Sequence, residues 1–175
     1  MRGRPRDAAD LGSEAEVEGF ARDVVLQRLT SQQRSRHDLE QALAKRHVPA
    51  EVAGAVLDRL EEVGLINDVD FARSWVQSRQ RSRGLSSTVL AMELRRQGIA
   101  DDISREVLDE LDPEVEVQAA HRLVQKKLRS MGALDQTTQT RRLVAMLARK
   151  GYAPQAALEV VRSELAAQAE PLDSL

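Results

Sequence analysis

The chain repeats itself along most of its length. Residues 20–60 align without a gap with residues 71–111 at an offset of 51, and 13 of the 41 paired positions are identical. A third, weaker copy follows at an offset of 53, in which Leu143 aligns with Leu90 and Leu39. Repeats of this length indicate tandem supersecondary units that bury their faces against one another. Such a chain offers an extended surface rather than an enclosed active site, which favours a binding protein.

The composition predicts helices and a cytosolic location. Apolar residues make up 42% of the chain but aromatic residues only 2%, so Leu, Val and Ala must supply the core, as in packed helices. The absence of Cys excludes disulfides and thiolate metal sites and is typical of cytosolic proteins. No apolar stretch follows Met1–Arg6, and no apolar run reaches the length of a membrane-spanning helix. We therefore expect a soluble cytoplasmic protein without membrane association.

Helix start and stop signals recur in every repeat. In the first, Ser35 is a predicted N-cap with Asp38 three residues later, and Leu39 and Leu43 form the buried stripe of a short helix. Gly64 supplies a helix stop. The other two repeats follow the same plan, with leucines at the aligned positions. We therefore predict three helices in each repeat.

The predicted fold class is all-α, with three tandem three-helix repeats that form an elongated, curved helical array. The predicted boundaries are a disordered tail at 1–13, repeats at 14–68, 69–112 and 113–167, and a flexible tail at 168–175.

The charge is unevenly distributed along the chain. The formal net charge is −2, yet residues 113–165 carry 9 basic and 5 acidic side chains, a net charge of +4. A nearly neutral protein is a poor candidate for a general nucleic-acid binder, because phosphate neutralisation drives that affinity. The positive third repeat still allows a local contact with an anionic partner.

The sequence contains no convincing catalytic or metal site. His37, His47 and His121 have no partner at helical spacing, so surface or capping roles are expected for them. The segment 67–70 resembles the start of a calcium loop but lacks its glycine and distal glutamate, so we interpret it as a helix cap. No glycine-rich turn leads into a phosphate-binding motif. We expect a protein that is not an enzyme and needs no cofactor or metal.

Basic residues form the pattern most suggestive of a binding surface. A basic pair lies at the end of the second helix of each repeat, and a further basic cluster lies near position 80. Cations near a helix C-terminus stabilise the helix dipole, which is the structural interpretation, whereas a pair repeated three times suggests a contact surface. The candidate partner-binding residues are Lys45, Arg46, Arg79, Arg81, Arg83, Arg95, Arg96, Arg149 and Lys150.

The stretch from Leu60 to Ile99 contains a set of motifs with a specific order and spacing. They are Leu60-Glu61-Glu62-Val63-Gly64-Leu65-Ile66-Asn67-Asp68, Phe71-Ala72-Arg73, Trp75-Val76, Arg79, Arg83-Gly84, Glu93-Leu94-Arg95 and Gly98-Ile99. With these residues, the stretch resembles the RecX family of bacterial recombination regulators. The sequence departs from the family pattern at Leu85-Ser86-Ser87, where a glycine or proline is expected. The third repeat matches less well than the second.

The resemblance implies a monomeric regulator that binds the RecA recombinase and the RecA–single-stranded DNA filament. It implies inhibition of filament growth, ATP hydrolysis, strand exchange and the co-protease activity that stimulates repressor cleavage. Weak direct contact with DNA stays open. The alternative is a helical regulator that acts on DNA directly, since three-helix units can place a helix in a groove. Acidic third helices and the shortage of aromatic stacking platforms argue against that alternative.

Overall fold

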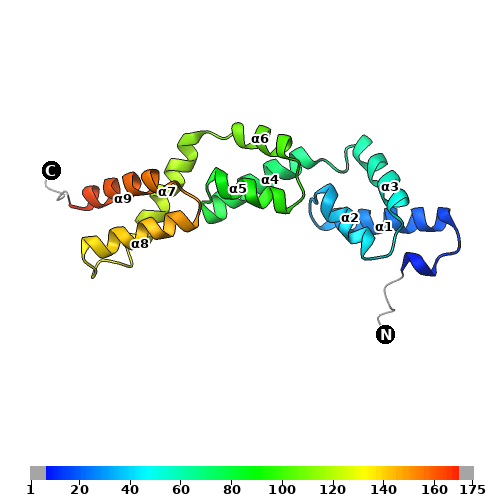
Figure 1. The fold of residues 1–175 in the computed structure, drawn as a ribbon, viewed down its shortest axis with the longest axis horizontal. Coiled ribbons are helices and arrows are strands. Elements are labelled where there is room, and N and C mark those ends of the chain that lie inside the picture. Colours follow the sequence, from blue (N-terminus) through cyan, green and yellow to red (C-terminus); the bar gives the residue numbers. More distant parts are fainter. Residues whose placement is uncertain (1–6, 170–175) are drawn as a thin grey trace. The chain divides into compact units, whose positions relative to one another are not determined.

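The computed structural model describes residues 7–169. This part of the chain forms nine α-helices and one short 3-10 helix, with no strand, which confirms the predicted all-α class. The helices follow one another in three triplets along the chain (Figure 1). Their bounds are η1 Ala8–Asp10, α1 Glu14–Ser31, α2 Arg36–Ala44, α3 Ala50–Glu62, α4 Asp68–Arg83, α5 Ser87–Arg96, α6 Asp101–Asp109, α7 Pro113–Leu128, α8 Gln136–Arg149 and α9 Pro154–Ala169.

Short polar side chains start several of the helices where the sequence predicts. The Ser35 hydroxyl accepts a hydrogen bond from the Asp38 backbone N–H at 3.2 Å and so caps α2. Asn67 caps α4 by accepting from two backbone N–H groups, which confirms the capping interpretation of this segment. Asp112 caps α7, whose first residue is Pro113. Each cap satisfies N–H groups that have no partner within their own helix.

The predicted disordered tail at 1–13 overlaps residues 7–13, where the structure has the short η1 helix and the N-cap of α1. Ala8 belongs to the core next to α1 and is only 5% exposed. Ser13 starts α1 through a capping box with Glu16, in which each side chain bonds to the other residue's backbone N–H. Burial of one small apolar side chain and this cap hold the segment in place. Residues 1–6 lie outside the described residues.

The flexible tail predicted at 168–175 overlaps the end of α9. Gln168 and Ala169 are the last residues of α9. Residues 170–175 lie outside the described range.

The structure contains two compact units. One contains α1–α3 and residues 94–104, and the other contains residues 75–93 and α7–α9. The first core gathers around Leu39, Leu43 and Leu57, and the second around Leu143 and Leu147, all 0% exposed.

The leucines at the aligned positions of the middle repeat, Leu90 and Leu94, are also 0% exposed. The buried stripe predicted for each second helix is therefore confirmed in all three repeats.

Candidate partner-binding surface

Two of the candidate arginines converge on one carboxylate. Arg79 Nε lies 3.3 Å from Glu93 Oε2, and Arg83 Nη1 lies 3.6 Å from Glu93 Oε1. The Arg79 guanidinium also stacks 4.2 Å above the Trp75 ring, whose indole N–H donates to Glu93 at 3.0 Å. These contacts link α4 to α5 and give both guanidinium groups the same carboxylate as their partner. Arg81, by contrast, is exposed and forms no ion pair with any described residue.

Lys150 also has an internal partner. Its Nζ donates a hydrogen bond to the backbone carbonyl of Arg83, the last residue of α4. Burial, together with the nearby Arg83 charge, lowers the pKa of Lys150. A cation at a helix C-terminus is stabilising because the last carbonyl groups carry partial negative charge. Lys150 therefore helps to join the third repeat to the end of α4.

The remaining candidates differ in their surroundings. Arg95 pairs with Asp101 at 3.1 Å although its side chain is 76% exposed. Arg46 is half-buried. Lys45, Arg96 and Arg149 are exposed, without an ion pair inside residues 7–169. Lys45-Arg46 and Arg149-Lys150 occupy one repeat position, and Arg95-Arg96 lies one residue earlier in its repeat. The three basic pairs do not share one environment.

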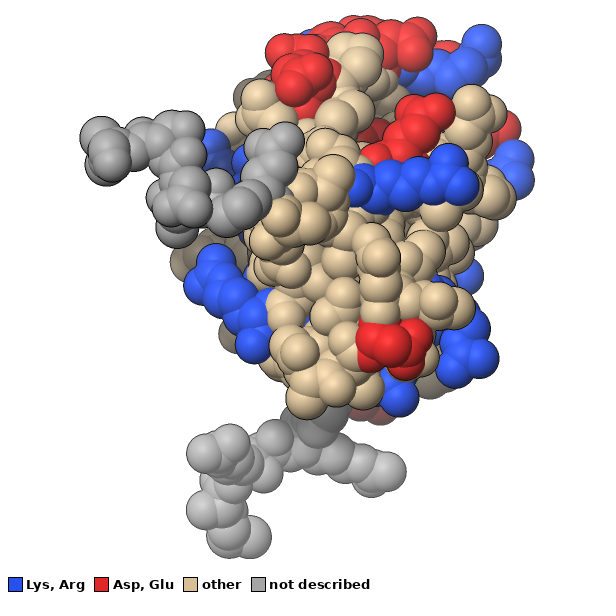
Figure 2. Space-filling model, turned by 90° about the vertical axis from the view of Figure 1, so that its left-hand side faces the viewer, with Lys and Arg blue, Asp and Glu red and all other residues tan. Residues whose placement is uncertain are grey.

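Uncompensated positive charge is concentrated in the third repeat. Eight of its nine basic side chains are exposed and form no ion pair with described residues. They are Arg122, Lys126, Lys127, Arg129, Arg141, Arg142, Arg149 and Arg162. On the face drawn in Figure 2, Lys and Arg side chains lie around a broad tan surface and do not merge into one positive patch.

The acidic side chains of this repeat are instead used internally. Glu164 Oε1 lies 2.6 Å from His121 Nδ1 and accepts from Gln125 at 3.0 Å. Asp135 caps α8 by accepting from the Thr138 hydroxyl and backbone N–H, and these bonds lower the pKa of Asp135. Because its carboxylates are occupied while its cations are free, the third repeat is the part of the chain best suited to an anionic partner.

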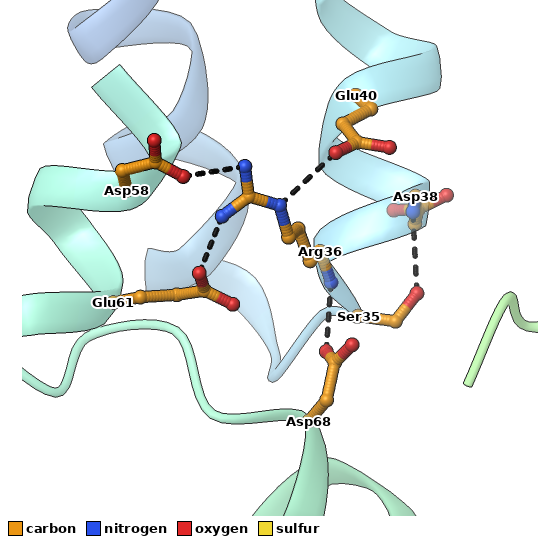
Figure 3. A network of polar contacts seen from close by, with 7 residues as sticks. All are labelled: Ser35, Arg36, Asp38, Glu40, Asp58, Glu61 and Asp68. Carbon is orange, nitrogen blue, oxygen red and sulfur yellow. Dashed lines mark hydrogen bonds and ion pairs between the residues drawn. The ribbon is translucent and has the colours of Figure 1, made fainter. Parts of the chain in front are cut away.

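Arg36, which the sequence analysis did not single out, organises the first repeat (Figure 3). Its guanidinium pairs with Glu40 at 3.0 Å, with Asp58 at 2.7 Å and with Glu61, which connects α2 to α3. The Arg36 backbone N–H donates to Asp68 Oδ1 at 2.8 Å. Of these contacts, only the pairing with Glu40 could be predicted from the sequence, because the two residues are four positions apart on one helix.

No reactive constellation is apparent in residues 7–169. These residues contain no group of three His, Cys, Asp or Glu side chains that could hold a metal ion. A mostly apolar pocket of about 320 Å³ includes Glu116 and Tyr152. Burial and nearby Glu116 raise the pKa of Tyr152 to about 12, so its phenol stays protonated at neutral pH. Among the described helices, none has the length and apolar character needed to cross a bilayer.

Family profiles match the chain in repeat order. The profile described as the first three-helix domain of RecX matches residues 21–60, the second matches 67–108 and the third matches 114–161. A curated relative named Regulatory protein RecX from Streptomyces coelicolor is 46% identical over 155 residues, covering 89% of this chain and 82% of the relative. Its namesake from Mycobacterium avium is 48% identical over 159 residues, covering 90% and 92%.

Solved structures show the same fold at low sequence identity. The crystal structure of RecX from Lactobacillus salivarius superposes with a TM-score of 0.78 at 19% identity, covering 87% of this chain and 99% of that one. A crystal structure of regulatory protein RecX gives a TM-score of 0.75 at 23% identity, with coverage of 86% and 73%. The predicted three-helix repeats, the profile matches and the curated relatives agree: this chain belongs to the RecX family.

Proposed function

We propose that this chain binds the RecA recombinase, both free and assembled on single-stranded DNA, and restrains the filament. The restrained activities are filament growth, ATP hydrolysis, strand exchange and co-protease activity. The observation that carries the proposal is the match of the RecX three-helix domains, in order, across residues 21–161. The function itself is the one that the resemblance to this family implies.

The charge distribution supports contact through the third repeat. Eight of its nine cations are exposed and form no ion pair with described residues, whereas Arg36, Arg79 and Arg83 in the preceding repeats are held by carboxylates. A cation that is already paired must lose its partner before it can bind another anion, so free cations are the better contact residues. We therefore assign the first partner contact to the exposed basic residues of α7 and α8. Of the original candidates, Arg149 fits this assignment best.

A binding titration tests the proposal and its alternative together. The chain is titrated with free RecA, with the RecA–single-stranded DNA filament and with bare single-stranded DNA of the same length. We expect tight binding to the filament, measurable binding to free RecA and weak, salt-sensitive binding to bare DNA. Equal affinity for bare DNA and filament, with no binding to free RecA, would contradict the proposal. That result would favour a regulator that acts on DNA directly.

A functional assay completes the test. Addition of the chain should lower the DNA-dependent ATP hydrolysis of RecA, and the loss should saturate as the filament is covered. If ATP hydrolysis is unchanged at a saturating concentration of the chain, the chain binds the filament without inhibiting it. Omission of divalent metal from the purification, with chelator treatment of the chain alone, should leave its helicity and its inhibition unchanged.

A further inference from the structure

The second helix of each repeat ends in the same turn. His47, Gly98 and Gly151 occupy aligned positions and have positive φ angles of 56°, 74° and 91°. The next residue in each repeat donates its backbone N–H to a carbonyl five residues earlier, as when Val48 donates to Leu43 at 3.1 Å. This is the left-handed C-terminal turn that closes many helices, and it directs the preceding carbonyl out of the helix.

In two of these turns, that carbonyl accepts a hydrogen bond from the serine that precedes the second helix of the preceding repeat. The Ser35 hydroxyl donates to the Gln97 carbonyl at 2.7 Å, within the first compact unit. The Ser86 backbone N–H donates to the Lys150 carbonyl at 3.0 Å, within the second. Ser35 and Ser86 are themselves aligned and are 0% and 1% exposed. The chain therefore contains one type of joint twice.

The approach at both joints is close. A Cβ added at Gly98 would lie 2.3 Å from the His37 Cβ, and one added at Gly151 would lie 2.3 Å from the Ser86 Oγ. A carboxylate in the first turn of the next triplet's first helix, α4 or α7, completes each joint by accepting the N–H of the residue after the serine. Arg36 donates to Asp68 and Ser87 donates to Glu116, both at 2.8 Å.

The corresponding turn of the first repeat is also covered, but by a different element. The Ala8 backbone N–H donates to the Arg46 carbonyl at 3.1 Å, the position aligned with Gln97 and Lys150. The Asp7 carboxylate lies 2.8 Å from His47 Nδ1. The η1 segment therefore contacts the turn at His47, whereas the start of a second helix contacts the corresponding turns at Gly98 and Gly151.

We propose that residues 7–10 act as a cap that closes the joint surface of the first repeat and keeps it from pairing with a second copy of this chain. The end of a repeat array needs such a cap, because an uncovered end presents the surface with which its neighbours associate. The cap donates the Ala8 N–H to the Arg46 carbonyl. At the two internal joints, the corresponding donor is Ser35 or Ser86, at the start of the preceding repeat's second helix. Histidine is tolerated in place of glycine here because no helix start abuts it.

A second copy is the partner that carries a complementary surface. At the internal joints, the bound group is the start of a second helix of this same chain. Among the described residues, the start of α8 is the second-helix start that no such turn covers. α8 begins one turn before Gln139, the position aligned with Ser35 and Ser86, and its cap Asp135 is exposed. Asp135 could replace Asp7 opposite His47 and Arg46. Because each chain carries one surface of each kind, the contact would be head-to-tail and open-ended.

Sedimentation velocity over a concentration series tests the proposal with two truncations. Removal of residues 1–10 deletes the cap, whereas removal of residues 1–6 keeps it and serves as the matched control. We expect the full chain and the control to sediment independently of concentration, while the capless chain sediments faster as its concentration rises. A capless chain that stays helical and sediments like the control would overturn the proposal. Association of the control to the same extent would overturn it too.

Removal of one charge identifies the partner surface. In the capless chain, Asp135→Asn keeps a capping side chain at the start of α8 but removes the negative charge opposite Arg46 and His47, so association should weaken. Asp102→Asn, at an exposed position in the first turn of α6, should leave it intact. Association that is unchanged in Asp135→Asn would rule out the start of α8 as the partner surface.

A point substitution keeps the test available if the capless chain does not fold. Ala8→Pro removes the N–H that bonds to Arg46, and the preceding residue, Asp7, already has the extended backbone that a proline requires before it (φ −110°, ψ 148°). In hydrogen exchange, residues 43–48 should exchange faster in Ala8→Pro than in the exposed control Asp10→Asn. Equal exchange in both would show that the Ala8 bond does not hold the cap.

Discussion

At the scale of single residues, Asp68 is held under unusual conditions. It is the first residue of α4, is partly buried, and accepts the backbone N–H of Arg36 at the start of α2 (Figure 3). Burial raises the pKa of Asp68 above its ordinary value of 3.8, despite the bond from Arg36. The folded state therefore binds a proton on Asp68 more readily than the unfolded state does. Above its native pKa, ionised Asp68 makes the folded state less stable than a neutral acceptor would.

We accordingly expect Asp68→Asn to be more stable than the wild type at pH 7. Asparagine keeps a carbonyl oxygen for the Arg36 N–H and never ionises. The advantage should shrink as the pH falls through the raised pKa of Asp68 towards 3.8, because Asp68 is then neutral in both states. Urea unfolding at several pH values measures the difference.

Asp102→Asn is the control for this substitution, since Asp102 is an exposed carboxylate in the first turn of α6. A less stable Asp68→Asn protein at pH 7 would mean that the negative charge itself strengthens the joint.

Glycine at position 151 should resist substitution for two reasons. Its φ of +91° disfavours any L side chain, and a Cβ would come within 2.4 Å of Val89 Cγ2. Gly151→Ala should therefore cost about 1–2 kcal/mol for the backbone and about 1–3 kcal/mol for overpacking. Gly64 has a similar φ of +74° but nothing within 4 Å, so Gly64→Ala should show the backbone cost alone. Equal losses in thermal unfolding would exclude the packing contribution.

Residue roles were predictable from the sequence only where they depend on near neighbours. The caps at Ser35 and Asn67 follow from residues within three positions, and the buried leucines follow from helical spacing. The pairing of Arg83 with Glu93 and the bond from Lys150 to the Arg83 carbonyl depend on contacts between separate helices. The sequence of a basic pair therefore does not show which of its two side chains already has a partner inside the protein.

At the scale of elements, α8 differs from its counterparts in the charge it leaves free. Arg141, Arg142 and Arg149 are exposed along this helix and form no ion pair in the described part of the chain. α8 also lines a shallow groove of about 570 Å³ together with Leu158 of α9. The helix thus combines free cations with an open, largely apolar surface.

Neutralising these three arginines together should weaken filament binding without unfolding the chain. Each exposed charge contributes about 0.2–1 kcal/mol, so the variant with Gln at 141, 142 and 149 should bind roughly 3- to 150-fold more weakly. The loss should diminish at high salt, because exposed charges are screened. Binding isotherms at two salt concentrations provide the measurement.

The matched control removes the same charge elsewhere. Arg22, Lys45 and Arg96 are also exposed and free of ion pairs among residues 7–169, and they lie in the other compact unit. Their replacement by Gln should have little effect on binding. A larger effect of this control than of the α8 variant would move the contact away from the third repeat.

The order of the N-terminal segment could not be inferred at the element level. Residues 7–10 are short and contain no periodic apolar pattern, and only one small side chain, Ala8, enters the core. Their position depends on the Arg46 carbonyl and on His47, almost forty residues later in the chain. Such contacts leave no local pattern, whereas the nine long helices do.

At the scale of the whole molecule, the sequence predicts an extended particle. In a repeat array, each unit contacts only its neighbours, so an array of this kind is expected to be less compact than a single globular domain. A globular protein of this length has a radius of gyration of about 16 Å. We expect small-angle scattering from the full chain to give a clearly larger value, and a value near that of a globule would contradict the predicted array.

The single tryptophan of this chain makes the Trp75–Arg79–Glu93 cluster optically visible. Its indole is stacked on a guanidinium and donates to a carboxylate, so its emission reports on the junction of α4 and α5 and on nothing else. A ligand that binds only at α8 should leave the emission unchanged. A ligand that draws Arg79 or Arg83 away from Glu93 should shift it. Intrinsic fluorescence can therefore distinguish, in unlabelled protein, a partner that reaches this junction from one that does not.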